Sequence, residues 1–127
     1  MRNSWIKLFL VCGGLGVVCP ASAGAKNPWP VTVNYTYSYA NGALGTARNS
    51  ADNNQDIGCN VTSYSWGYCY AVDASGNYAG CYANTEAHWA AIRAIDSDSA
   101  VDFTWDASGY CNSIIVYHGS SFEPKQP

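Results

Sequence analysis

The feature that most constrains this fold is a set of four cysteines in a short chain that carries an export leader. They are Cys59, Cys69, Cys81 and Cys111. An even number of cysteines in a small exported domain is typical of two disulfide bonds. Four cysteines allow three pairings, and their spacing does not choose among them. Because no C-x-x-C pair is present, the sequence favours disulfides over a zinc site.

The first 23 residues have the three parts of a secretory signal peptide. Arg2 and Lys7 provide positive charge, residues 8–18 are apolar, and residues 21–23 (Ala-Ser-Ala) offer a small-x-small cleavage pattern. The apolar run is shorter than the roughly 20 residues that a bilayer-spanning helix needs. We therefore predict that residues 1–23 are removed on export. The product would be secreted or periplasmic, with no membrane span.

The remaining chain has the length of one domain. Prolines in residues 24–30 favour an extended lead-in, and residues 31–127 would form a single disulfide-stabilised domain. After the leader, four basic and nine acidic side chains remain, so the net charge is −5. Such a chain offers no basic patch for phosphates, and we expect no nucleic-acid partner.

Alternation of apolar and polar residues with a period of two predicts most of the chain to be β-strand. The clearest segment runs over residues 31–39 and ends at an Asn41-Gly42 turn. Two Asp-Ala-Ser-Gly sequences predict further turns. The predicted strands cover 31–39, 57–61, 68–72, 78–82, 101–105 and 111–118.

One helix is predicted over residues 87–95, with Asn84 or Thr85 as its N-cap and Glu86 near its positive end. Residues 45–56 are expected to form a loop, and residues 123–127 a loose tail. The predicted fold class is therefore mainly β, a β-rich α+β domain. It would be an antiparallel sheet or small sandwich of about six strands with one short helix and two disulfides.

No catalytic signature stands out in the sequence. Serines are plentiful, but none lies in a Gly-x-Ser-x-Gly elbow. The two histidines, His88 and His118, are expected at a helix surface and a strand end. A small secreted hydrolase of ribonuclease type stays open as an alternative, with Glu86 and His118 as acid and base and Arg93 or Arg48 as the cation.

Two acidic clusters resemble calcium ligands. Residues 52–58 begin like an EF-hand loop, but the glycine comes one position late and the twelfth position is Ser63. Asp96, Asp98 and Asp102 form the second cluster. Solvated turns account for both, so we predict neither a metal nor another cofactor.

The strongest non-random feature is aromatic content among small polar residues. Tyr64, Trp66 and Tyr68 place three rings around a predicted turn. Tyrosine and tryptophan rings combine an apolar face with a polar edge, which suits stacking on sugars and contact with proteins. We interpret the other stripe, Tyr35 to Tyr39, as core filling and cross-strand pairing.

Four short segments carry a resemblance. They are residues 45–50 (GTARNS), 57–59 (IGC), 96–99 (DSDS) and 122–125 (FEPK). Together they resemble a group of small exported bacterial proteins of unassigned role. The resemblance covers about Gly45 to Lys125 and implies bacterial export. It brings no activity and no site residue.

The function expected from these observations is non-catalytic binding outside the cytoplasm, to carbohydrate or a cell-surface component, through Tyr64, Trp66 and Tyr68. The first alternative is the small hydrolase described above. The second is a secreted protein-interaction or inhibitor factor, in which the disulfide frame would pre-organise a loop.

Overall fold

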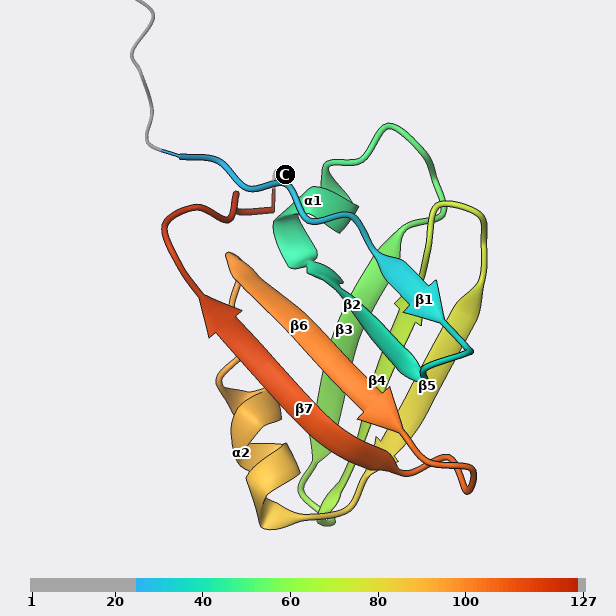
Figure 1. Ribbon diagram of the computed structural model, residues 1–127. Helices are drawn as coiled ribbons and strands as arrows, with labels where there is room; N and C mark the ends of the chain where they lie inside the picture. Colours follow the sequence, from blue (N-terminus) through green and yellow to red (C-terminus); the bar gives the residue numbers. More distant parts are fainter. Residues whose placement is uncertain (1–24, 126–127) are drawn as a thin grey trace, which may run out of the picture.

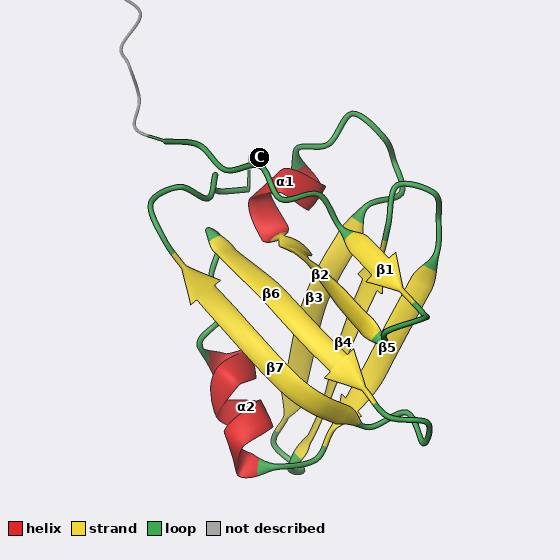
Figure 2. Cartoon of the chain, viewed as in Figure 1, coloured by secondary structure: helices red, strands yellow, loops and turns green. Residues whose placement is uncertain are grey.

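A computed structural model describes residues 25–125 of the chain (Figure 1). The predicted signal peptide, residues 1–23, lies outside the described residues. Seven strands and two helices make up the described part, as Figure 2 shows. The strands are β1 (Thr32–Asn34), β2 (Tyr39–Ala43), β3 (Asp56–Thr62), β4 (Trp66–Val72), β5 (Tyr78–Ala83), β6 (Ser99–Trp105) and β7 (Cys111–His118). The helices are α1 (Leu44–Arg48) and α2 (Glu86–Arg93).

The strands form two antiparallel sheets, which confirms the predicted mainly β class. One sheet has the order β1-β2-β6-β7 and the other the order β3-β4-β5. Figure 1 shows the four-stranded sheet in front of the three-stranded one. The core between them consists mostly of small side chains around Val101 and Phe103, both fully buried. Alanine and cysteine supply most of the rest, so the two layers pack closely.

The second sheet is a β-meander, formed by the strands that the sequence predicts over 57–61, 68–72 and 78–82. β4 alternates as expected, with Cys69 and Ala71 buried and Tyr68 and Tyr70 on the outer face. β4 pairs with β3 through Cys69 and Cys59, and with β5 through Cys69 and Cys81. The register therefore places three cysteines in one row across the sheet.

The disulfides are Cys59–Cys69 and Cys81–Cys111. The first joins neighbouring strands within the meander. The second joins β5 to β7 and so connects the two sheets. The sequence predicts two disulfides. Cys69 lies opposite both Cys59 and Cys81 in the sheet, and because Cys81 bonds to Cys111 of the other sheet, Cys69 pairs with Cys59.

The predicted single strand over residues 31–39 is wrong. The structure has a hairpin there, in which Asn34 of β1 faces Tyr39 of β2. The Asn34 side chain accepts a hydrogen bond from the Tyr37 N–H at 3.0 Å, and Ser38 adopts a positive φ of 52°. An asparagine that bonds backbone three residues ahead starts a turn. The turn is therefore at residues 35–38, and the predicted Asn41-Gly42 turn is part of β2.

The interpretation of the tyrosine stripe as core filling is also wrong for its first two members. Tyr35 is 59% exposed and Tyr37 is 75% exposed. Both lie in the turn between β1 and β2 rather than in a strand. The Tyr35 hydroxyl donates to the Tyr78 carbonyl at 2.7 Å, which connects this turn to β5.

The region predicted as a loop begins with the short helix α1. Its N-cap residue, Ala43, provides no side-chain cap, and a five-residue helix without a cap leaves no readable sequence pattern. Packing stabilises it instead, because Gly45 and Ala47 are buried. The Asn49 side chain donates to the Pro124 carbonyl at 3.1 Å. Pro124, in the predicted tail, therefore contacts the end of α1.

The predicted helix and its cap are confirmed as α2. The Thr85 hydroxyl accepts a hydrogen bond from the His88 N–H at 3.1 Å. Trp89 and Ile92 are buried on the core side, and the indole N–H of Trp89 donates to the Ala83 carbonyl at 2.9 Å. The helix ends at Arg93, two residues earlier than predicted.

Both Asp-Ala-Ser-Gly turns are confirmed, with matching geometry. The Asp73 carboxylate accepts from the Ser75 and Asn77 N–H groups, and the glycine Gly76 has a φ of 83°. In the second turn, Asp106 accepts from Ser108 and Tyr110 N–H groups in the same way, and Gly109 has a φ of 84°. Each aspartate bonds the turn backbone and each glycine takes the left-handed conformation.

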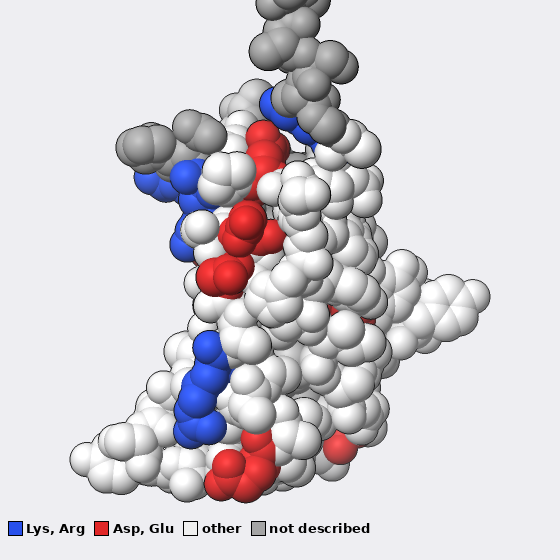
Figure 3. Space-filling model, turned by 90° about the vertical axis from the view of Figure 1, so that its left-hand side faces the viewer, with Lys and Arg blue, Asp and Glu red and all other residues white. Residues whose placement is uncertain are grey.

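The side of the molecule that carries α2 and the C-terminal residues holds both signs of charge. Figure 3 shows acidic side chains along the middle of this side, with basic ones interspersed. Charges of both signs in alternation are typical of a solvated surface.

Candidate functional site

The most prominent surface feature is a set of exposed rings on the outer side of the three-stranded sheet. We call it the aromatic face and define it as Trp66, Tyr68, Tyr78, Tyr82 and Tyr110. Trp66 and Tyr68 come from β4, Tyr78 and Tyr82 from β5, and Tyr110 from the residue before β7. Trp66, Tyr78, Tyr82 and Tyr110 are each between 43% and 51% exposed, and Tyr68 is half-buried.

Four of these rings form a continuous row. Neighbouring ring centroids are 6.2 Å apart for Trp66 and Tyr68, and the two planes differ by only 7°. The row continues at 5.0 Å from Tyr68 to Tyr82 and at 6.3 Å from Tyr82 to Tyr110. These distances fall in the range of direct ring contacts. The rings therefore form one connected apolar surface.

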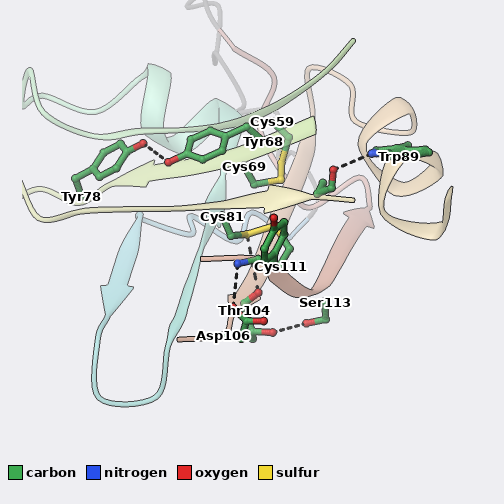
Figure 4. The surroundings of a disulfide bond; sticks show 12 residues. Cys59, Tyr68, Cys69, Tyr78, Cys81, Trp89, Thr104, Asp106, Cys111 and Ser113 are labelled. Carbon is green, nitrogen blue, oxygen red and sulfur yellow. Dashed lines mark hydrogen bonds between the residues drawn. A yellow bond between two sulfur atoms is a disulfide. The ribbon is translucent and has the colours of Figure 1, made fainter. Parts of the chain in front are cut away.

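Tyr68 lies along the sheet because the position beneath it is a glycine. A Cβ on Gly80 would lie 2.6 Å from Tyr68 Cζ, so a larger residue there would displace the ring. Tyr68 Oη is 2.8 Å from Tyr78 Oη, and Figure 4 shows the two phenols pointing toward each other. Tyr70 covers Gly58 of the neighbouring strand β3 in a similar way. A Cβ added to Gly58 would lie 3.2 Å from Tyr70 Oη. Glycines beneath tyrosine rings let the rings lie flat on the sheet.

The environment of Tyr68 and of the neighbouring Tyr70 favours the neutral phenol. Burial, followed by the hydrogen bond to Tyr78, raises the pKa of Tyr68 to about 12. Burial also raises the pKa of Tyr70. Neutral hydroxyls both donate and accept hydrogen bonds. Asn60, exposed and opposite Tyr68 in the sheet, adds an amide to the same side.

A connection between the two sheets brings Tyr110 to this face. Cys81 and Cys111 form the disulfide between the sheets. Tyr82 follows Cys81 in the chain, and Tyr110 precedes Cys111. The Tyr82 N–H donates to the Gly109 carbonyl at 2.9 Å in a parallel bridge. The disulfide and this bridge together hold the last ring of the row.

The structure brings together two of the three ring residues that the sequence suggests. Trp66 and Tyr68 are adjacent on the aromatic face, whereas Tyr64 lies in the β3–β4 turn and is 90% exposed. Tyr64 has no ring contact with another aromatic side chain within residues 25–125. Sequence reasoning missed Tyr78, Tyr82 and Tyr110 as site residues. The available signal was the even, four-residue spacing of Tyr78 and Tyr82, which places both on one face of the returning strand.

The acid-base pair of the hydrolase alternative is not assembled. Glu86 is the first residue of α2, and Figure 1 shows that β7, which ends at His118, ends near the opposite end of this helix. His118 Nδ1 instead lies 3.7 Å from Asp96 Oδ2 and 3.4 Å from the Ser99 hydroxyl. Ser99 is fully buried. A triad serine must be accessible and bonded to the ring nitrogen that the acid does not occupy, and Ser99 meets neither condition.

Three aspartates of the acidic clusters accept hydrogen bonds from groups of the protein itself. Asp52 accepts hydrogen bonds from the Asn54 and Gln55 N–H groups and from the Gln55 side chain. Asp96 accepts from the Ser99 hydroxyl at 2.8 Å, and Asp102 from the Asn41 side chain on the outer side of the other sheet. Within residues 25–125, no three His, Cys, Asp or Glu side chains are grouped so as to hold a metal ion.

Comparison of the chain with models of protein families, with curated proteins and with solved structures finds no match. The resemblance to small exported bacterial proteins stays a prediction. No helix of the described residues is long and apolar enough to cross a membrane.

Proposed function

We propose that this chain is an exported, non-catalytic recognition domain that binds carbohydrate through the aromatic face. The observation that carries the proposal is the connected row of rings from Trp66 to Tyr110 on the outside of a sheet. Sugar rings present flat C–H surfaces that pack on aromatic faces, and hydroxyls at the ring edges take up hydrogen bonds. Tyr68, Tyr78 and Asn60 supply such bonds beside the row.

Export of the domain supports a ligand outside the cytoplasm, in a polysaccharide or on a cell surface. The two disulfides and the signal-peptide pattern agree with an oxidising compartment. A rigid, disulfide-bonded sheet also presents the rings without ordering a loop first, which lowers the entropic cost of binding. The hydrolase alternative has no assembled acid-base pair to support it.

The test is a binding screen of the purified, oxidised protein against soluble glycans and cell-wall polysaccharides, followed by calorimetry on any ligand found. Replacing Trp66 with Ala should weaken binding by about 30-fold or more, the scale of a central interface residue. Tyr37→Ala is the matched control, since this exposed tyrosine lies outside the aromatic face. It should leave the affinity unchanged.

Three outcomes would overturn the proposal. One is the absence of binding to any glycan, which would point to a protein partner for the same rings. Another is equal loss of affinity in Trp66→Ala and Tyr37→Ala. The third is glycan turnover with a pH optimum that His118→Ala abolishes, which would establish the hydrolase alternative.

A further inference from the structure

Strand β3 has one side of its backbone without a partner strand. It is an outer strand of the sheet β3-β4-β5, and Figure 1 shows it as the strand of that sheet nearest to α2. Apart from Asp56 at its start, β3 contains no charged residue, and it contains no proline. Charged side chains and prolines are common means of protecting an exposed sheet edge from pairing. The edge of β3 lacks both along most of its length.

The register of the sheet identifies the backbone groups that face this edge. Cys59 and Cys69 lie opposite each other with their Cα atoms 4.0 Å apart, which is closer to the about 4.5 Å of an antiparallel pair without mutual backbone hydrogen bonds than to the about 5.5 Å of a bonded pair. A Cβ added to Gly67 would lie 3.0 Å from the Asn60 carbonyl oxygen, so this carbonyl is directed toward β4. Because bonding alternates along a strand, the N–H and C=O groups of Ile57 and Cys59 point away from the sheet.

These two donors and two acceptors have no partner in the described part of the chain. Within residues 25–125, no other backbone segment bonds to Ile57 or Cys59 on this side. The other edge of the same sheet is partly closed, because the Tyr78 carbonyl accepts from the Tyr35 hydroxyl and the Tyr82 N–H donates to the next segment. β3 is therefore the edge of this sheet with backbone hydrogen-bonding capacity to spare.

A cavity of about 830 Å³ borders this edge. Its lining includes Ile57 and Cys59 of β3, Arg48 at the end of α1 and Ile92 of α2. A strand added to a sheet lies about 4.8 Å from its neighbour, so a strand added to β3 would enter this cavity. Because α1 and α2 both pack against β3, the opening between them suits a single extended chain better than the edge of another folded domain.

The charges of the cavity lining balance. The lining holds two cations, Arg48 and Lys125, and two carboxylates, Asp52 and Asp56. Most of the other residues that it takes from the loop before β3 are polar but uncharged. Such walls favour a neutral ligand rich in hydrogen-bonding groups, as a peptide main chain is.

Side-chain contacts are available on both sides of the edge. On the inner side, Leu44 and Ile95 line the cavity and are half-buried, so they offer an apolar contact. On the outer side, the Tyr70 hydroxyl lies over Gly58 and has no hydrogen-bond partner within residues 25–125. An extended peptide directs alternate side chains to opposite faces of a sheet. One set would meet the apolar pair and the other set the tyrosine.

We propose that the edge of β3 binds an extended peptide segment of another protein, which adds a strand to the sheet β3-β4-β5. The main chain of the peptide bonds to the outward N–H and C=O groups of Ile57 and Cys59. Main-chain bonds supply affinity in this mode of recognition, and alternate side chains supply specificity. The partner segment is proline-free and carries an apolar side chain toward Leu44 and Ile95. The site is not part of the aromatic face, so it stands if glycan recognition fails.

The first measurement is amide hydrogen exchange, by NMR, of the oxidised protein purified after expression of the full chain. The N–H groups of Ile57 and Cys59 should exchange at least tenfold faster than those of Gly58 and Asn60, which bond to β4. Equal protection of all four in dilute protein would show that the edge is already paired and would overturn the proposal. Protection that increases with protein concentration would place a second copy there and would also overturn it.

The second measurement uses a peptide probe selected from a phage-displayed library of random linear peptides. The synthetic probe should slow exchange at Ile57 and Cys59 at least tenfold. The same probe with every amide N-methylated keeps its side chains but loses its donors, so it should bind at least tenfold more weakly. The proposal is overturned if no peptide is enriched, if the N-methylated probe binds equally well, or if the protected amides belong to the aromatic face.

Variants separate this site from glycan recognition. Ile57→Pro removes an outward N–H that β4 does not use, so it should weaken the probe at least tenfold. Ile57→Val keeps this N–H and should bind the probe as the native protein does. Should Ile57→Pro fail to fold, the N-methylated probe decides. Trp66→Ala should bind the probe normally, and a matching loss in Trp66→Ala and Ile57→Pro would overturn the assignment to β3.

Discussion

The phenol ring of Tyr68 lies directly over Gly80, on the neighbouring strand. A Cβ at position 80 would come within 2.6 Å of Tyr68 Cζ and within 2.9 Å of Cε1. The same placement brings the Tyr68 hydroxyl to 2.8 Å from that of Tyr78. The absence of a side chain on one strand therefore decides how the central ring of the aromatic face lies.

Changing Gly80 to Ala tests this relationship. The methyl group should lift Tyr68 off the sheet and break its hydrogen bond to Tyr78, so the pKa of Tyr68 should fall from about 12 toward its ordinary value of 10. An NMR titration of the tyrosine Cζ signals would measure this fall in the pKa of Tyr68. In Gly119→Ala, where the nearest side-chain atoms are 3.7 Å away, the Tyr68 titration should match the native protein. A native-like Tyr68 titration in Gly80→Ala would contradict the packing described.

Gly45 should be equally intolerant of a side chain, for a different reason. A Cβ there would lie 2.7 Å from the Glu123 carbonyl carbon, in the segment that packs on α1. Gly45→Ala should therefore destabilise the protein by about 1–3 kcal/mol, although alanine favours helix, because overpacking outweighs propensity. Urea denaturation of the variant and the native protein measures the loss of unfolding free energy. A stabilised variant would show that the C-terminal segment does not pack on α1 in solution.

The two disulfides should differ in their contribution to stability. Cys81–Cys111 closes 30 residues and Cys59–Cys69 closes 10. Restriction of the unfolded chain grows with loop length, so the longer bridge should contribute about 1 kcal/mol more. Denaturation of the two double-alanine variants compares them directly. Equal losses of unfolding free energy in the two variants, or a larger loss for the shorter loop, would contradict stabilisation through restriction of the unfolded chain.

The loop after α1 should become less stable in acid. The hydrogen bond from the Gln55 side chain, with the Gln55 and Asn54 N–H groups, lowers the pKa of Asp52 from 3.8 to about 2. Because the folded-state pKa is the lower one, this carboxylate stabilises the fold above pH 3.8, and the contribution is lost as the pH falls toward 2. A carboxyl NMR titration measures the midpoint directly.

Gln55→Ala is the matched variant for this titration. It removes the first cause of the shift, so the pKa of Asp52 should rise toward 3.8. An unchanged midpoint in Gln55→Ala would show that the backbone N–H groups alone hold the carboxylate.

Local chemistry in the sequence was enough for the elements that depend on neighbours along the chain. The meander, both Asp-Ala-Ser-Gly turns and the Thr85 cap of α2 follow from period-two alternation and from side chains that bond nearby backbone. Of the three rings that the sequence groups at the β3–β4 turn, Trp66 and Tyr68 are in contact and Tyr64 is apart. The turns and the cap join groups within a few residues of one another, and the strands of the meander follow one another along the chain, so local spacing carries the information.

Contacts between distant segments decided the rest. The C-terminal segment contacts α1 through Glu123 and Pro124, and Tyr110 joins Tyr82 because the Cys81–Cys111 bridge brings the two sheets together. The turn at residues 35–38 was missed because the tyrosine alternation continues through the reversal. The sequence by itself therefore determined the β-rich class and most local turns. Only the tertiary structure decided the disulfide pairing and the row of rings, because each depends on packing between residues far apart in the chain.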